Sequence, residues 1–177
     1  DDPISRNQGE SLQEIGIIVQ FYDIVGSGVQ GYVSNISKLK QVVKSFAPDI
    51  IHAHYSLTGY IAYLASGNIP VVCSLMGSDV NDSKAVHKIL LHLFIRCCWS
   101  VTIVKSKAMY DKLGMNNIKV IPNGVNLNLF RPMDMTLAKN ALGWDMERRY
   151  VIFAANPSRP EKNFKLAQEV MQEVSRQ

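Results

Sequence analysis

The chain has 177 residues, of which 47% are hydrophobic and 19% are charged, a balance typical of a globular protein with one domain and part of a second. Its net charge of +4 and pI of about 9.0 suit a phosphorylated ligand or an anionic membrane surface, but they are too weak to indicate nucleic-acid binding, for which no motif is present. Cys73, Cys97 and Cys98 lack the spacing of a metal site, which predicts no bound metal and free thiols in a reducing cytosol.

Apolar runs of strand length alternate with helical periodicity along the chain. Residues 1–16 resemble a loop and a helix that lead into a first strand. A longer helix follows, because apolar positions from Ile36 to Phe46 share one face, and it ends before Pro48. The predicted strands are residues 15–22, 49–53, 71–75, 101–104, 119–121 and 150–154. The other predicted helices are residues 57–65, 84–98, 107–113, 137–142 and 164–174.

Local signals mark the ends of some helices. Residues 81–83, Asn-Asp-Ser, supply capping oxygens before the helix that begins at residue 84, and Gly143 is a plausible stop for the helix 137–142. The most apolar helical segment, residues 89–99, is too short to span a bilayer and contains His92 and Arg96. We therefore predict that it is a buried helix.

Continuous Val/Ile runs separated by helices predict a parallel sheet covered on both faces, so the expected fold is α/β, a doubly wound Rossmann-like domain. Ligands of such sheets bind beyond the carboxyl ends of the strands. The segments expected there are GSGVQG, HAHYS, MGSDVND, PNGVNLNLF and NPSRPEKN, whose composition suits a sugar or phosphate ligand. The last helix has nothing to pack upon, and a strand should precede residue 1, so we expect a fragment truncated at both ends.

GSGVQG, residues 26–31, has the G-x-G-x-x-G spacing of a dinucleotide-binding turn. Such a turn requires an acidic residue at the end of the next strand, where this chain has His52 and His54; Asp49 lies at the wrong end. The stretch is better interpreted as a flexible turn between a strand and a helix. A nicotinamide oxidoreductase remains the weaker rival.

Four blocks of sequence, in the same order, resemble glycosyltransferase family 4. DIIHAH (49–54) is similar to the family's D-[IV]-[IV]-H-x-H strand, and VCSLMGSD (72–79) to its V-V-x-x-x-H-G-S-D turn. KVIPNGVN (119–126) with FRP (130–132) is similar to the family's V-I-P-N-G-V-D…F-x-P segment. YVIFAANPSRPEKNF (150–164) resembles the first strand and phosphate loop of its donor-binding domain.

The resemblance implies a retaining transferase of the GT-B fold, which has two Rossmann-like domains. Residues 1–132 would be the N-terminal, acceptor-side domain without its first strand, and residues 133–177 a linker and the start of the C-terminal, donor-binding domain. The implied reaction moves a sugar from a nucleotide-sugar to a glycan or lipid-linked acceptor in cell-surface polysaccharide synthesis. The implied location is the cytoplasm, with possible peripheral contact at the inner membrane. No metal, cofactor or nucleic acid is expected, and this chain alone is expected to be inactive.

The resemblance also assigns candidate residues to the cleft. Met76 occupies the place of a family histidine near the transferring sugar, and because methionine neither donates a hydrogen bond nor shuttles a proton, a backbone amide or Ser78 would make that contact. The catalytic residue therefore stays unknown. The other cleft candidates are His54, Gly77, Asp79, Asn123 and Gly124. The donor-phosphate candidates are Arg159, displaced from the family position at Pro157, with Lys162 and Asn163.

Each candidate has a structural alternative. His52 is expected to be a hydrogen-bonded core histidine; Asp79 would cap the next helix, and Asn123-Gly124 would form a tight turn. Arg159 and Lys162 would sit in a solvated loop, and Lys38, Lys40 and Lys44 either face water or meet anionic lipid. The alternative function is a non-catalytic sugar- or nucleotide-binding module of the same fold, for which Met76 is the best argument.

Overall fold

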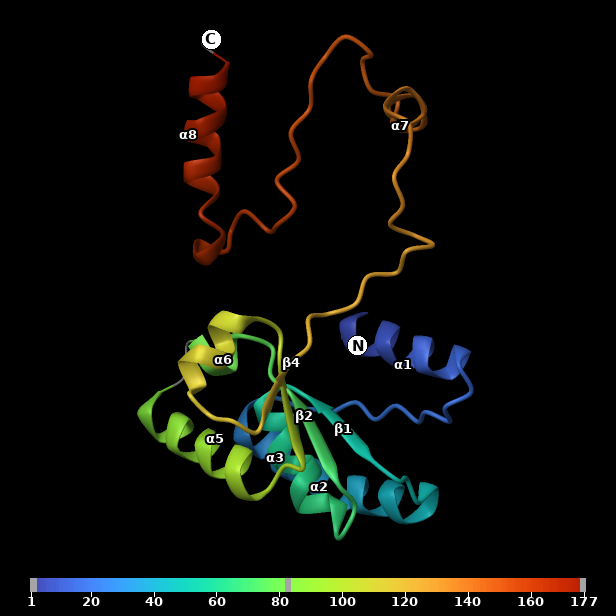
Figure 1. The fold of residues 1–177 in the computed structure, drawn as a ribbon, viewed down its shortest axis with the longest axis vertical. Helices are drawn as coiled ribbons and strands as arrows, with labels where there is room; N and C mark the ends of the chain where they lie inside the picture. The colour runs from blue at the N-terminus through green and yellow to red at the C-terminus, as the bar shows by residue number, and fades with distance from the viewer. Residues whose placement is uncertain (1–2, 82–83, 176–177) are drawn as a thin grey trace. The chain divides into compact units, whose positions relative to one another are not determined.

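The computed structural model describes residues 3–81 and 84–175. The chain divides into two units, Asp1–Leu127 and Asn128–Gln177, and each is described by itself. Unit 1 contains the sheet, and unit 2 contains two α-helices and a short 3-10 helix among its described residues (Figure 1). The units divide five residues before the domain boundary that the sequence predicts after residue 132.

The sheet of unit 1 has four parallel strands in the order β1-β2-β3-β4. They are β1 (Ile51–His54), β2 (Val71–Ser74), β3 (Val101–Val104) and β4 (Ile118–Val120), each within two residues of a predicted strand. The register aligns Ala53, Cys73, Thr102 and Ile118, so these side chains share one face of the sheet. The predicted α/β class with a parallel, Rossmann-like sheet is confirmed.

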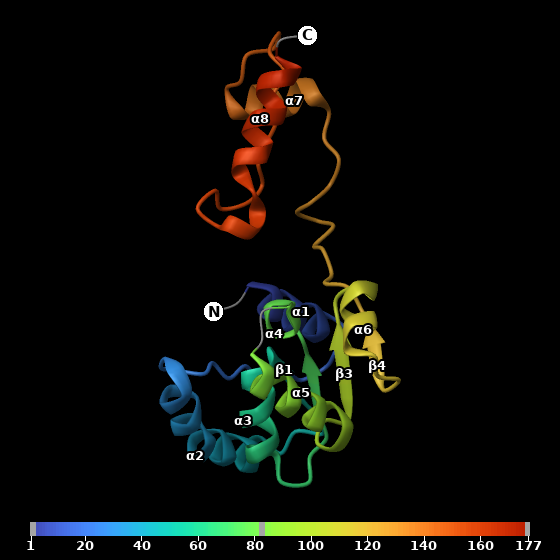
Figure 2. The ribbon, with the colours of Figure 1, turned by 90° about the vertical axis from the view of Figure 1, so that its left-hand side faces the viewer.

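Six helices accompany the sheet within the described part of unit 1. They are α1 (Pro3–Glu14), α2 (Gly28–Phe46), α3 (Ser56–Ser66), α4 (Ser78–Asn81), α5 (Ala85–Cys97) and α6 (Lys107–Leu113). Strands that follow one another across a parallel sheet are joined by right-handed crossovers, which bring successive connecting helices to the same face. The core agrees with this rule, because it joins α3, α5 and α6 to the face that carries Ala53 and Cys73 (Figures 1 and 2).

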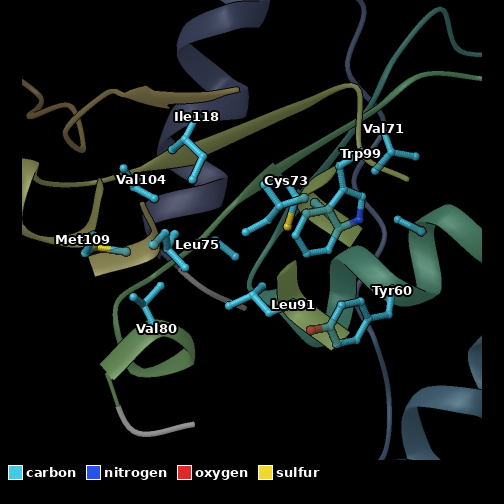
Figure 3. Close-up of a cluster of buried hydrophobic side chains, with 14 residues drawn as sticks. Tyr60, Val71, Cys73, Leu75, Val80, Leu91, Trp99, Val104, Met109 and Ile118 are labelled. Atoms are coloured by element: carbon cyan, nitrogen blue, oxygen red, sulfur yellow. The ribbon is translucent and has the colours of Figure 1, made fainter. Parts of the chain in front are cut away.

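The main core forms where the crossover helices meet the sheet (Figure 3). Trp99 donates its indole N–H to the Gly59 carbonyl at 3.1 Å and stacks on Tyr60. Gly59 is required by this packing, since a Cβ there would lie 2.6 Å from Cys73 Sγ and 2.7 Å from the Trp99 ring. The close approach of α3 to β2 therefore depends on the missing side chain.

A second core cluster joins α2 to α3 through Leu39, Val43, Ile61 and Ala65. The glycine stretch 26–31 lies at the start of α2, where Gly26 has a φ of +109° and a Cβ on Gly31 would approach the Gly26 carbonyl carbon to 2.6 Å. The stretch is thus a turn into a helix, as predicted, but the segment before it, residues 17–25, is irregular and not the predicted strand.

Two predicted strands are absent from the described sheet. Residues 17–25 and 149–154 are irregular, and Ile18, Val151 and Ile152 are each at least 70% exposed. A β-ladder requires a second extended backbone alongside, and the described residues of neither segment have one. The predictions of strands at 15–22 and 150–154 are therefore wrong for this structure.

Helix α5 differs from the prediction of a buried helix. Leu91 and Ile95 are at most 1% exposed, but Val86 is 78% and Ile89 is 73% exposed. The N-cap residue of α5 is Lys84, which makes no side-chain cap bond. Asn81 belongs to α4, and residues 82 and 83 lie outside the described residues.

Unit 2 contains α7 (Met135–Leu142), the 3-10 helix η1 (Pro160–Lys162) and α8 (Phe164–Val174). Gly143 ends α7 with a φ of +65°, as predicted, and Asn163 caps α8 by accepting from the Leu166 N–H at 3.4 Å. Across the described parts of both units, no helix combines the length and apolar character needed to cross a membrane.

Candidate functional site

The loops that follow the four strands meet at the carboxyl edge of the sheet. Three backbone bonds extend the ladder into them: Tyr55 N–H to Ser74 O at 2.8 Å, Leu75 N–H to Ile103 O at 2.8 Å, and Ile121 N–H to Val104 O at 2.9 Å. His54 and the turn from Met76 to Asp79 are therefore neighbours, although more than twenty residues separate them in sequence. This edge is the candidate site, as expected for a parallel α/β sheet.

Asp79 binds two of these loops together. Its carboxylate, only 2% exposed, accepts the backbone N–H groups of Ser56 at 3.1 Å, Met76 at 3.1 Å and Gly77 at 3.0 Å. Burial raises the pKa of Asp79 above its ordinary value, while the backbone N–H donors oppose the shift. The carboxylate thus caps the start of α3 and accepts both amides of the 76–77 turn, and among the described residues it makes no bond to the start of the next helix, where the sequence predicted a cap.

The backbone beside Asp79 is strained. Tyr55 has φ +80° and ψ 142°, a conformation that residues with a side chain rarely adopt, and Gly77 has φ +107°. Such a conformation costs about 1–3 kcal/mol at a non-glycine residue and persists only where the surroundings enforce it. Here the bonds from Ser56 and Gly77 to Asp79 enforce it. Backbone strain of this kind concentrates at binding and catalytic sites.

A second polar network lies along the strands at the same edge. His52 Nε2 is 2.9 Å from Ser74 Oγ, which also accepts from Lys105 Nζ at 3.3 Å; the tautomer of His52 decides which of His52 and Ser74 donates. Burial, followed by the nearby His54 and Lys105, lowers the pKa of His52 to about 4. The ring of His54 stacks on His52 with centroids 4.5 Å apart. His52 is therefore hydrogen-bonded, as the sequence predicts, but it is half-buried and belongs to neither core cluster; it is neutral at neutral pH.

The surroundings of Met76 narrow the choice of groups that contact a sugar. Met76 is half-buried, and its N–H and that of Gly77 are both bound to Asp79. The amides of Met76 and Gly77 are thus already bonded, and the contact of the Ser78 hydroxyl or of another backbone amide of this turn with a sugar stays a prediction. Ser78 is exposed and begins α4.

Asn123 and Gly124 follow β4 and are exposed. The predicted tight turn is not formed, because residues 121–126 continue without a turn after Ile121 bonds to Val104. Both residues nevertheless belong to the loop that leaves the carboxyl end of β4. Their role in a cleft stays a prediction.

Sequence reasoning missed Lys105 and Ser74 as members of the site, and it included Ser56 only as the end of the segment HAHYS. Lys105 directly follows strand β3, so its position beyond a strand end was a usable signal. The contacts of Ser74 and Ser56 carry no local signal, since their partners, His52 with Lys105 and Asp79, are 22 or more residues away. Within the described residues, no group of three His, Cys, Asp or Glu side chains is placed to hold a metal ion.

The donor-phosphate candidates lie in unit 2. Arg159 and Asn163 line a hollow of about 440 Å³, together with Lys165, whereas Lys162 is not among its lining residues. Arg159 Nε lies 3.4 Å from Glu161 Oε1, so its charge is partly balanced in this state. All of these residues are exposed, which leaves them available to an anionic ligand.

Comparisons with known proteins identify the family of the chain. Residues 4–129, which include all four strands and their carboxyl-edge loops, match the model of Glycosyltransferase Family 4. A protein of Bacillus subtilis (strain 168), provisionally named the teichuronic acid biosynthesis glycosyltransferase TuaC, is 29% identical to the chain over 133 residues, which is 70% of this chain. The match covers 34% of the relative, so the chain spans about a third of the relative's length. The chain belongs to Glycosyltransferase Family 4.

Proposed function

We propose that the chain forms the acceptor side of a retaining glycosyltransferase, which moves a sugar from a nucleotide-sugar to a glycan or lipid-linked acceptor. The main support is the carboxyl edge of the sheet, where Asp79 holds the strained Tyr55–Ser56 backbone and the Met76–Gly77 turn in place beside Ser78 and His54. Strain enforced by a buried carboxylate is a feature of sites whose geometry matters more than their stability. The name of the relative supports a product among cell-surface polysaccharides.

In this proposal the two units contribute different chemistry. Ser78, His54 and Asn123 contact the acceptor, and Arg159, Lys162 and the start of α8 at Asn163 contact the donor diphosphate. The leaving diphosphate gathers negative charge as the glycosidic bond breaks, and fixed positive groups lower that barrier. A helix N-terminus favours an anion for the same reason. The proposal includes no metal or cofactor, a cytoplasmic location and peripheral contact with the membrane.

The proposal is tested by nucleoside-diphosphate release and by the configuration of the product. The 177-residue chain and a form extended through a complete donor domain are incubated with UDP-, GDP- and ADP-sugars and an oligosaccharide or glycolipid acceptor. We expect release and transfer only from the extended form, with the anomeric configuration of the donor retained by NMR. Transfer by the 177-residue chain alone, or inversion in the product, would contradict the proposal.

A non-catalytic binding module is the second candidate, and Met76 is the observation that favours it. A binding module would retain donor or glycan affinity without releasing nucleoside diphosphate. Replacing Met76→His restores the family residue at this turn. An extended protein that binds donor, stays inactive and gains no activity with Met76→His would support the module.

A further inference from the structure

Helices α2, α3 and α5 of unit 1 form one layer with α3 in the middle. α2 packs on α3 through the Leu39–Ile61 cluster, and α5 packs on it through Phe94, whose ring lies 4.5 Å from Tyr60 and 5.5 Å from Tyr63 between centroids. Figure 2 shows the three helices side by side. We call the side of this layer that faces away from the sheet the outer face.

The outer face carries an apolar row along α5. Val86, Ile89, Leu90 and Leu93 are 78%, 73%, 38% and 52% exposed, and their spacing of three or four residues places them opposite the buried Leu91–Ile95 stripe. A surface helix ordinarily presents polar residues there. Exposed apolar side chains continue on α3 at Tyr63 (38%) and Leu64 (50%). A contiguous apolar surface of this kind indicates a binding partner.

Basic side chains flank this row on both sides. Lys88, His92 and Arg96 follow one another at intervals of four residues along α5 and are all exposed. On the other side, Lys40 and Lys44 of α2 line a hollow of about 470 Å³ together with Leu64 of α3. None of the three helices contains Asp or Glu, although the chain has 15 acidic residues. The outer face therefore combines an apolar centre with positive edges.

We infer that the outer face docks on an anionic membrane surface, with α5 lying along the interface. Apolar side chains that enter the acyl boundary while Lys and Arg meet lipid phosphates produce this mode of binding. A second copy of the chain is a poorer occupant, because a two-fold contact through the same face would bring like charges together. The positive edges therefore favour an anionic partner, and the apolar row favours a lipid surface over a soluble anion.

The outer face borders the candidate site. The start of α5 is linked to the start of α3 by His87 Nε2, which lies 3.3 Å from Ser56 Oγ, and the Ser56 N–H is bound to Asp79. Docking through Val86 and Ile89 would therefore bring the carboxyl edge of the sheet close to the lipid surface. In that respect the inference rests on the proposed function, because a lipid-linked acceptor would be presented there.

Vesicle flotation tests the apolar part of the inference. The 177-residue chain is mixed with vesicles of phosphatidylcholine alone or of phosphatidylcholine with phosphatidylglycerol. We expect at least roughly tenfold stronger binding to the anionic vesicles, since each basic residue at the surface adds a several-fold preference. The double variant Ile89→Asp/Leu93→Asp should lose that binding. The matched control Leu137→Asp/Ile152→Asp, on side chains exposed by 62% and 72% in unit 2, should retain it.

A second pair of variants tests the charges. Lys88→Glu/Arg96→Glu should reduce anionic-vesicle binding roughly tenfold or more and weaken its salt dependence. Arg148→Glu/Arg149→Glu changes the net charge equally at exposed positions of unit 2 and should have a small effect. Circular dichroism of each variant verifies the fold, which these exposed positions should not alter.

Three results would overturn the inference. They are equal binding of the chain to neutral and anionic vesicles, no binding to either, or the same loss in the α5 variants as in their unit 2 controls. If light scattering shows a dimer that Leu93→Asp converts to a monomer, and the chain binds no vesicles, the outer face would instead be assigned to a second copy of the chain. Vesicle binding requires neither a sugar donor nor sugar transfer. The proposed function is assayed with a water-soluble acceptor in the absence of vesicles, so the two proposals can fail independently.

Discussion

Removing the carboxylate of Asp79 should destabilise unit 1 and loosen the candidate site together. Asp79→Ala leaves the N–H groups of Ser56, Met76 and Gly77 without their acceptor. Ser56 is fully buried, whereas Met76 and Gly77 are half-buried and can recover water. A buried donor without a partner costs about 1–3 kcal/mol, and a partly hydrated one costs less, so we expect a loss of about 3 kcal/mol in the free energy of unfolding.

The asparagine variant separates the parts of this effect. Asp79→Asn keeps one carbonyl oxygen as the acceptor for the Met76 and Gly77 N–H groups. The Ser56 N–H then either faces the side-chain NH₂ group, which cannot accept a hydrogen bond, or shares that same carbonyl oxygen. We expect a loss of about 1–2 kcal/mol, which lies between wild type and alanine. The control Asp111→Ala removes an exposed carboxylate 2.7 Å from Lys107 and should cost less than about 1 kcal/mol.

Urea unfolding followed by tryptophan fluorescence measures these differences. A Trp144→Phe background leaves Trp99, which is 4% exposed in the core, as the reporter. Amide hydrogen exchange then locates the effect, because the N–H of Ser56 should lose protection first. If Asp79→Ala unfolds within about 0.5 kcal/mol of wild type, or if Asp111→Ala is equally destabilised, the assigned role of Asp79 is refuted.

Three further changes test other parts of the account. The pKa of His52 is about 4 in the folded chain and about 6.5 in the unfolded chain, so the unfolded chain binds more protons between these values and the free energy of unfolding should rise by about 3 kcal/mol as the pH increases across this range. His52→Gln should make the urea midpoint nearly independent of pH there. The same pH dependence in wild type and variant would contradict this. Gly59→Ala places a Cβ 2.6 Å from Cys73 Sγ and should cost about 1–3 kcal/mol by thermal unfolding, whereas Gly124→Ala, with open space around it, should be nearly neutral. Arg159→Gln should lower kcat/KM for the donor about thirtyfold in the extended protein; an unchanged value would remove Arg159 from the donor site.

The central strands were predictable because each is a short apolar run with a buried face. Thr102 and Val104 alternate with less buried neighbours in β3, and short apolar runs also located β1, β2 and β4. The failures at 15–22 and 150–154 have a physical cause. Propensity indicates an extended backbone, but strand formation depends on a partner strand, which local sequence does not specify.

The candidate site was predictable as a place but not as a set of contacts. The rule for carboxyl ends of parallel strands located His54 and the Met76–Asp79 turn correctly at one edge. The binding of Asp79 to Ser56 joins residues 23 apart in sequence, and nothing local in either residue indicates it. The four-residue helix α4 was missed for a related reason, since a single turn has no periodicity to detect.

The exposed row on α5 was misread for the opposite reason. A segment with apolar residues on two faces satisfies the pattern of a buried helix, and only the structure shows that Leu91 faces the core while Ile89 does not. Composition alone thus identified an apolar helix without identifying which of its faces is covered.

The acceptor dependence of transfer tests the central claim most directly. In the extended protein, Ser78→Ala and Asn123→Ala alter exposed groups at the carboxyl edge of the sheet. Loss of one hydrogen bond to the acceptor should raise its KM about tenfold while the KM of the donor stays unchanged. An unchanged acceptor KM in both variants, or a defect confined to the donor, would show that this edge does not hold the acceptor.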